Sequence, residues 1–204
     1  MFNEGLLIVI SGPSGVGKGT ICKELIRRNI NSIELSVSAT TRKPRNGEFE
    51  GISYYFKGKD EFEEMIKGEQ FLEYAKVYDN YYGTPKTQVI NKLKEGKDII
   101  LEIDTQGAMK VKRNFKEGIF IFIMPPSYKE LKKRIVNRRT ESEDDIKKRL
   151  KCAFEEIQSV SNYDYIVVND DIDKAVSKID CIINAEKCRL CRYNIDFSEF
   201  KEEL

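Results

Sequence analysis

A glycine-rich turn between a predicted strand and a predicted helix most constrains how this chain can fold. Residues 12–20 read Gly-Pro-Ser-Gly-Val-Gly-Lys-Gly-Thr, follow the apolar run at 6–10 and precede a segment, 21–26, with helical spacing. Glycines let backbone N–H groups close around phosphate oxygens, and the positive end of the next helix points to the same place. In this context the pattern predicts a phosphate-binding loop rather than an ordinary turn.

Within this loop, Lys18 supplies a mobile positive charge for the outer phosphates of a nucleotide. The usual pattern ends Gly-Lys-Ser/Thr, and the hydroxyl of its last residue holds Mg²⁺. This chain has Gly19 at that position and Thr20 one place later, so we expect Thr20 to reach the metal largely through water. The predicted nucleotide contacts of the loop are Gly12, Pro13, Ser14, Gly15, Val16, Gly17, Lys18, Gly19 and Thr20.

Length and charge favour one soluble domain with insertions. The chain has 204 residues, and its 34% charged residues nearly cancel to a net charge of +1. This balance predicts no general attraction to nucleic acid or to a membrane surface. No apolar stretch approaches the roughly 20 residues of a membrane span, and the N-terminus does not have the pattern of a secretory signal. We therefore expect a cytoplasmic protein, and nothing in the sequence implies a protein partner.

The sequence contains no histidine, which excludes Ser-His-Asp and Cys-His catalysis. Phosphoryl transfer remains open, because it depends on positioning and on charge stabilisation.

The five cysteines fall into two groups. Cys22, Cys152 and Cys181 lie in segments with helical spacing, where we expect small buried apolar residues. Cys188 and Cys191 form a CxxC pair, which suits half a zinc site or a redox pair. Because no second pair accompanies it, we predict that this pair holds no metal.

The apolar pattern predicts an α/β fold with a parallel sheet flanked by helices. Beside the run at 6–10, the segments 98–104, 118–124 and 165–168 are almost continuously apolar, as strands buried in a parallel sheet are. Segments with helical spacing separate them. Residues 35–85 are instead rich in tyrosine, glycine and charge, which predicts an inserted subdomain.

Helix signals are clear in the C-terminal half. Ser127 and Glu130 form a capping box, which predicts a helix start. A second long helix is expected to begin near 140–142, and a last helix to cover 172–186. The apolar stripe expected on the second helix consists of Leu150, Phe154 and Ile157.

Two arginines, Arg42 and Arg45, flank a turn made rigid by Pro44. Guanidinium groups bind phosphate oxygens in a fork, so these arginines suit a second phosphate-bearing substrate. Taken alone, this segment is also compatible with an exposed basic turn that binds no substrate.

From about residue 6 to residue 187, the chain resembles the guanylate kinase family in an ordered series of motifs. The motifs are Ser38-x3-Arg42-x2-Arg45, Gly47-Glu48-x2-Gly51-x2-Tyr54, Phe71-x-Glu73, Asn80-x-Tyr82-Gly83-Thr84 and Glu102-Ile103-Asp104-x-Gln106-Gly107. The resemblance implies that ATP and GMP are converted to ADP and GDP with Mg²⁺. It leaves open whether dGMP is also used.

The resemblance also implies a role for each matching residue of the acceptor site. The predicted phosphate clamp on GMP consists of Arg42, Arg45, Tyr54 and Tyr82. Glu73 is expected to recognise guanine, since a carboxylate accepts two hydrogen bonds and guanine offers two donors on one edge. The remaining predicted GMP contacts are Ser38 and Thr84, on the O6 side of the base, and Glu102 and Asp104, near the metal and its waters.

On the donor side, the resemblance implies a mobile lid whose arginines reach the transferring phosphoryl group. Its candidates are Arg134, Arg138 and Arg149, although Arg139 adjoins Arg138 and the sequence does not decide between them. Together with Lys18 and Arg42 they form the predicted catalytic set. Asn169 is the expected contact of the loop beside adenine, and an N-cap turn is the alternative there.

The implied organisation has four parts. They are a P-loop core at 1–34, 86–125 and 150–187, a GMP-binding insert at 35–85, a helical lid at 126–149 and a C-terminal tail at 188–204. Two other functions stay open. One is a catalytically inactive guanylate-kinase-like module that binds proteins; the other is a kinase for a different nucleoside monophosphate, against which Glu73 argues.

Overall fold

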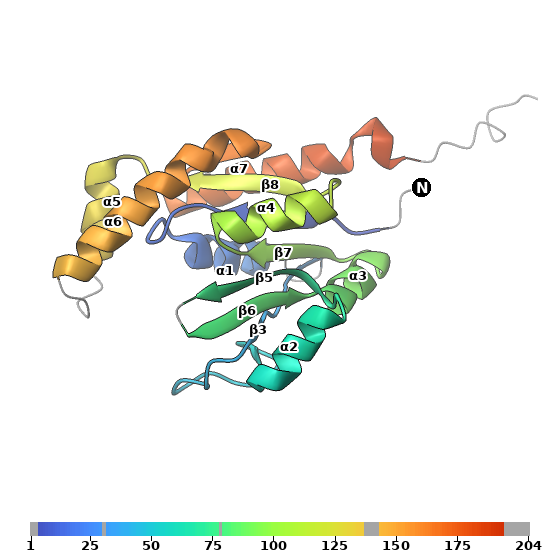
Figure 1. Ribbon diagram of the computed structural model, residues 1–204. Coiled ribbons are helices and arrows are strands. Elements are labelled where there is room, and N and C mark those ends of the chain that lie inside the picture. Colours follow the sequence, from blue (N-terminus) through green and yellow to red (C-terminus); the bar gives the residue numbers. More distant parts are fainter. Residues whose placement is uncertain (1–3, 30–31, 78, 137–142, 194–204) are drawn as a thin grey trace, which may run out of the picture.

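A five-stranded parallel sheet forms the centre of the molecule, in a computed structural model that describes residues 4–29, 32–77, 79–136 and 143–193 (Figure 1). In spatial order its strands are β2 (Ile33–Leu35), β7 (Asp98–Glu102), β1 (Leu7–Ser11), β8 (Ile119–Met124) and β9 (Tyr165–Val168). Four of these strands confirm the apolar runs of the sequence. The edge strand β2 was not predicted, because its three residues are too short to carry a pattern.

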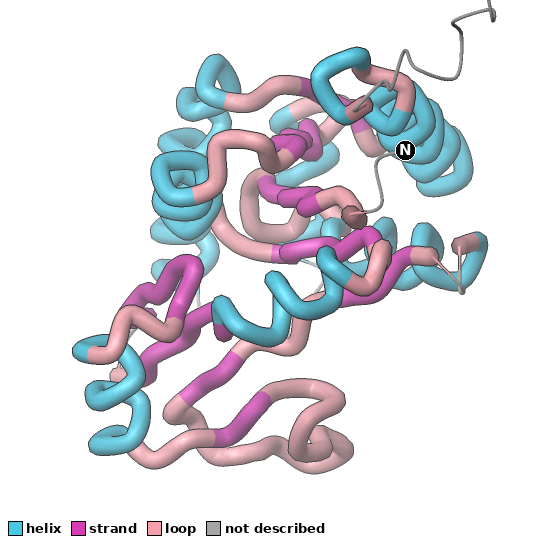
Figure 2. Tube along the Cα trace, turned by 90° about the vertical axis from the view of Figure 1, so that its right-hand side faces the viewer, coloured by secondary structure: helices cyan, strands magenta, loops and turns pink. Residues whose placement is uncertain are grey.

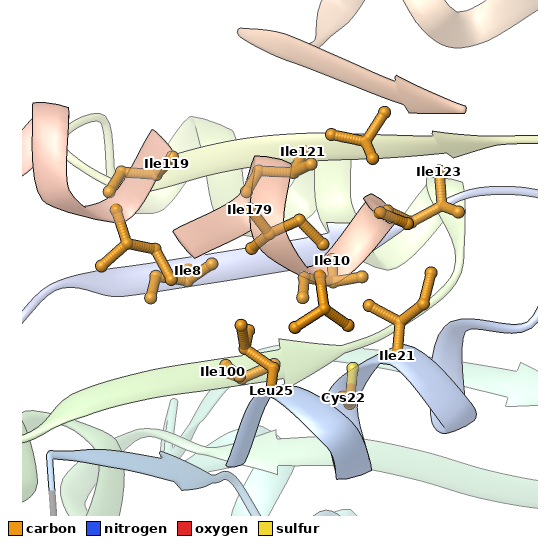
Figure 3. Packing of buried hydrophobic residues seen from close by; sticks show 14 of the residues in the cluster. Ile8, Ile10, Ile21, Cys22, Leu25, Ile100, Ile119, Ile121, Ile123 and Ile179 are labelled. Atoms are coloured by element: carbon orange, nitrogen blue, oxygen red, sulfur yellow. The ribbon is translucent and has the colours of Figure 1, made fainter. Parts of the chain in front are cut away.

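Helices cover both faces of this sheet. They are α1 (Lys18–Arg28), α3 (Lys86–Lys94), α4 (Thr105–Asn114) and α7 (Ile172–Lys187). Alternate residues of β1 point to opposite faces. Ile10 packs with Ile21 of α1 and Ile179 of α7 (Figure 3), whereas Val9 belongs to a second cluster with Val111 of α4. The phosphate-loop segment is thereby anchored in a core that is apolar on both sides.

A second sheet lies beside the first, within residues 39–85 (Figures 1 and 2). Its strands, in spatial order, are β4 (Tyr55–Phe56), β3 (Ala39–Thr40), β6 (Asn80–Pro85) and β5 (Phe71–Val77), and α2 (Lys59–Lys67) packs on it. Phe62 of α2 stacks on Phe71 with ring centroids 4.5 Å apart. Helix α4 packs against both β1 and β5, so it connects the two sheets.

Two further helices form an arm at one end of the central sheet (Figure 1). Helices α5 (Tyr128–Val136) and α6 (Glu143–Gln158) pack through a small core that includes Leu131, Leu150 and Ala153. The prediction that Phe154 faces inward was wrong, because its side chain is 56% exposed. Ala153 takes the buried position instead, while Leu150 and Ile157 pack in this core as predicted.

The predicted start of α5 is confirmed in part. Ser127 accepts a hydrogen bond of 3.1 Å from the backbone N–H of Glu130, as a capping box requires. The Glu130 carboxylate does not complete the box; it binds Arg134 at 3.1 Å. The acidic side chain thereby orients an arginine that sequence analysis assigned to catalysis.

A short 3₁₀ turn, Ser159–Asn162, precedes β9. After β9 the chain forms α7 and then a second short 3₁₀ turn, Leu190–Arg192.

Cys22 is buried as predicted, but Cys152 and Cys181 are exposed, so the prediction was wrong for both. Each lies on the outer side of its helix. Among the residues that the structure describes, no helix combines the length and the apolar character needed to cross a membrane.

Candidate active site

The phosphate loop runs from the end of β1 to the start of α1, where three glycines adopt left-handed backbone conformations. At Gly12, φ is 142° and a Cβ atom would lie 2.3 Å from the Ile123 carbonyl oxygen. At Gly17, φ is 98° and a Cβ atom would lie 2.7 Å from the Asn169 side-chain nitrogen. Any other residue at these two positions would strain the backbone and clash with its neighbours, so both positions favour glycine.

Lys18 folds back over this loop. Its Nζ donates hydrogen bonds to the carbonyl oxygens of Gly12, at 2.5 Å, and of Pro13, at 3.3 Å. Burial lowers the pKa of the Lys18 ammonium. The nearby carboxylates of Glu156 and Glu102 raise this pKa, but their effect is smaller than that of burial. The loop thus presents a partly desolvated cation beside a row of backbone N–H groups, which is a site for an anion.

A cavity of about 260 Å³ opens between the two sheets, close to this loop. Most of the predicted acceptor-site residues line it: Ser38, Tyr54, Glu73, Tyr82, Glu102 and Asp104. They come from five separate segments of the chain. The cavity combines aromatic walls with three carboxylates, so it suits a planar ring that carries hydrogen-bond donors.

Glu73 is the most buried carboxylate of this cavity, with 8% of its surface exposed. Burial raises its pKa to about 7, although the hydrogen bond from Thr84 favours the charged form. Thr84 Oγ1 donates this bond to Glu73 Oε1 at 2.8 Å and fixes the carboxyl group. A Cβ atom on Gly107 would lie 3.1 Å from Glu73 Oε2, so glycine there leaves room for the carboxylate.

Arg42 lies at the rim of the cavity rather than inside it. Its guanidinium group binds Glu48 at 2.8 Å and stacks over the Tyr54 ring, 5.5 Å from the centroid. Tyr54 meets Tyr82 edge to face, with centroids 6.0 Å apart. Arg45 is exposed, and its backbone N–H donates to Glu48 at 2.8 Å. Glu48 therefore organises the segment that carries both arginines.

The end of β7 supplies two acidic residues with different surroundings. Asp104 caps α4, since its Oδ1 accepts a 2.7 Å hydrogen bond from the Gly107 N–H. Glu102 Oε1 lies 3.3 Å from the place where a Cβ atom of residue 19 would be. A larger residue at position 19 would therefore require the Glu102 carboxylate to shift by a few tenths of an ångström.

A second hollow lies on the other side of the loop, lined among others by Gly17, Thr20, Arg134 and Asn169. Asn169 is 3% exposed and donates from Nδ2 to the Val16 carbonyl oxygen at 2.7 Å. Arg134 donates to the same oxygen at 3.3 Å and to the Asn169 carbonyl oxygen at 3.2 Å. The structure thus brings these two predicted residues together at the loop.

The comparisons with known proteins agree with this geometry. A family model described as guanylate kinase matches residues 4–186. The chain belongs to the guanylate kinase family. A guanylate kinase of Caldanaerobacter subterraneus subsp. tengcongensis is 58% identical over 200 residues, which cover 98% of this chain and 97% of that protein. One of Clostridium tetani is 63% identical over 189 residues, 93% and 90% of the two chains.

Structural comparison agrees with these sequence matches. The crystal structure of a guanylate kinase from Anaplasma phagocytophilum matches with a TM-score of 0.75 and 36% identity, over 93% of this chain and 90% of that one. These relatives are guanylate kinases and match nearly the whole chain, so the protein is an enzyme, a nucleoside monophosphate kinase. Among the described residues, nothing favours the inactive binding module.

Not every predicted residue joins the site as described. Arg138 and Arg139 lie outside the described residues. Arg149 donates to the Ser14 hydroxyl at 2.7 Å and so reaches the loop from α6. Sequence analysis assigned no site role to Glu48 or to Glu156, the latter of which accepts a hydrogen bond from the loop. Glu156 shares a helix face with Arg149, seven residues earlier, but the local sequence of α6 does not indicate that this face meets the loop.

Proposed function

We propose that this member of the guanylate kinase family transfers the γ-phosphoryl group of ATP to GMP. An oxygen of the GMP phosphate attacks the γ-phosphorus, the bond to the β–γ bridging oxygen breaks, and ADP leaves. One observation carries the proposal: the buried carboxylate of Glu73, held by Thr84, faces a cavity beside the phosphate loop. Such a carboxylate suits guanine and does not suit adenine.

Glu73 accepts hydrogen bonds from N1–H and the 2-amino group of guanine. Adenine lacks both of these donors, so AMP would leave the buried carboxylate without the two hydrogen bonds that guanine supplies, which is costly. Ser38 supplies a hydroxyl group toward O6, whereas the single hydroxyl proton of Thr84, which was also expected on the O6 side, is donated to Glu73. Tyr54 and Tyr82 line the same cavity. This set of contacts supports GMP over a different nucleoside monophosphate.

Arg42, Arg45, Tyr54 and Tyr82 hold the GMP phosphate. Arg42 is paired with Glu48 and stacked on Tyr54, so its position is set before the nucleotide binds. Phosphate competes with Glu48 for the guanidinium group, and the fork geometry favours a bidentate contact. Arg45 is exposed and closes on the phosphate from the solvent side.

On the donor side, the N–H groups of residues 12–20 surround the outer phosphates of ATP, and Lys18 neutralises them. Arg134, Arg149 and Arg138 stabilise the charge that spreads over the transferring oxygens. Asn169 lies beside adenine. The hydrogen bonds that join Arg134 and Asn169 to the Val16 carbonyl oxygen support this arrangement.

The oxygen ligands at the loop fit Mg²⁺. Kinases hold this ion by one or two protein oxygens together with substrate phosphates, so a full protein cage is not needed. Glu102 is the proposed ligand, because its carboxylate lies next to Gly19, the position at which the usual loop residue carries its hydroxyl. Thr20 and Asp104 contribute through water. Mg²⁺ held there would supply positive charge that stabilises the transferring phosphoryl group.

Three of the four parts of the chain carry out this reaction. The core binds ATP, residues 35–85 bind GMP, and the lid at 126–149 closes over both. Closure excludes water, so ATP is used for transfer and not for hydrolysis. We place the reaction in the cytoplasm, with ATP and GMP as the ligands and with no nucleic acid, membrane or protein partner.

A coupled ADP-release assay with ATP, Mg²⁺ and one acceptor at a time tests the function. Turnover is expected with GMP and not with AMP, CMP or UMP. Glu73→Gln should abolish this preference, whereas Glu64→Gln, on the exposed side of α2, should behave as wild type. GMP binding without turnover would instead support the inactive module, and full GMP turnover in Glu73→Gln would remove Glu73 as the guanine contact.

A further inference from the structure

Glu156 binds the phosphate loop, although no part of the loop motif predicts such a partner. It lies on α6, and its Oε2 accepts a 3.2 Å hydrogen bond from the backbone N–H of Ser14. Two turns earlier on the same helix, Arg149 donates to the hydroxyl of that serine at 2.7 Å. Residues seven apart share a helix face. Helix α6 therefore holds Ser14 by its N–H and by its hydroxyl.

The Glu156 carboxylate occupies part of an anion site. Backbone N–H groups of the loop and the Lys18 ammonium make this region positive. Of the carboxylates around Lys18, Glu156 has the largest effect on the Lys18 pKa, ahead of Glu102 and Asp104. Burial raises the pKa of Glu156, while the Ser14 N–H and Lys18 favour its charged form. A side chain of this protein thus supplies the negative charge that the loop is built to bind.

We propose that Glu156 is a positioning residue: it holds α6 on the phosphate loop as an internal anion, and the outer phosphates of ATP displace it. One N–H makes one strong hydrogen bond, so a phosphate oxygen and Glu156 cannot share the Ser14 N–H. Two anions at this distance also repel each other. This inference rests on the proposed role of the loop in binding ATP.

The exchange couples nucleotide binding to the position of α6. Loss of the Glu156 contact removes one of the two hydrogen bonds that hold Ser14 to this helix. Because α6 packs on α5 through Leu150 and Ala153, a shift of α6 carries both helices of the arm. ATP thereby breaks this contact at the same step at which it fills the loop, which frees the arm for the closure proposed above.

The test is Glu156→Gln, which keeps the size of the side chain and an acceptor oxygen but removes the charge. Glu155→Gln is the matched control, since it is the adjacent acid and is exposed. Binding of inorganic tripolyphosphate is measured by titration calorimetry, and kcat and the KM values for ATP and GMP by the coupled assay. Glu156→Asp keeps the charge but shortens its reach, and it serves if the glutamine variant does not fold.

In Glu156→Gln, the tripolyphosphate affinity should rise and the KM for ATP should fall by about three- to tenfold, the effect of one partly solvated charge-assisted hydrogen bond. The KM for GMP should not change, and Glu155→Gln should match wild type. Equal or weaker tripolyphosphate binding in Glu156→Gln overturns the inference and leaves the proposed function standing. If wild type binds neither tripolyphosphate nor ATP, the proposed function fails as well.

Discussion

Replacing Glu73 by glutamine should stabilise the protein without ligand at pH 8, even though it removes the proposed guanine contact. The pKa of Glu73 is about 7 in the folded protein because the side chain is buried, against an ordinary value of 4.5. Below pH 4.5 the carboxyl group is protonated in the folded and in the unfolded chain, so it does not affect stability. As the pH rises toward 7, the unfolded chain loses the proton first, and the native state becomes less stable.

The free energy of unfolding that is lost through Glu73 stops growing above about pH 7. The loss is about 1.4 kcal/mol for each pH unit between 4.5 and about 7, so it reaches about 3 kcal/mol at pH 8 but stays under about 1 kcal/mol at pH 5. A glutamine has no charge to desolvate, it can still accept the 2.8 Å hydrogen bond from Thr84, and its amide can face the Asp104 carboxylate. The Tm at pH 8 should therefore rise by about 6–12 °C, for a chain of this size.

Thermal unfolding followed by circular dichroism at pH 5 and pH 8 measures this difference. Glu64→Gln, on the exposed side of α2, is the control and should shift the Tm at neither pH. An equal Tm change at the two pH values, or a lower Tm at pH 8, would refute the reasoning, because the effect would then not come from the charge on Glu73.

Three further predictions follow from the same geometry. The affinity for GMP, measured by calorimetry, should increase from pH 6 to pH 8 as Glu73 loses its proton, and a flat profile would contradict the guanine contact. Asp104→Ala should lower the free energy of unfolding in urea by about 1 kcal/mol, because α4 loses its N-cap; no change would show that the cap is not stabilising. Gly17→Ala should lower the free energy of unfolding by about 1–3 kcal/mol and raise the KM for ATP, since it strains the backbone and displaces Asn169. Gly58→Ala, with open space around it, should leave the KM for ATP unchanged.

Strands of the central sheet could be predicted where both faces are buried, because such strands are apolar at every position. Strand β8, Ile119–Met124, is the clearest case. The hairpin of β5 and β6 was not predicted as strands, since Asn80–Pro85 is half polar and pairs through its backbone across the second sheet. On α6, Leu150 and Ile157 were placed correctly, whereas Phe154 and Cys152 were misplaced, because helical spacing shows the period of an apolar stripe and not how far it extends around the helix.

The sequence by itself determined the phosphate loop, because residues 12–20 are adjacent and their glycines, lysine and flanking elements act over a short range. Family motifs also pointed to Glu73, but its shifted pKa arises from burial by parts of the chain that are distant in sequence. Tertiary structure alone decided the contact of Glu156 with Ser14, which are 142 positions apart. No local pattern can encode such a contact, since it exists only when the packing of α6 against the core has placed one helix face over the loop.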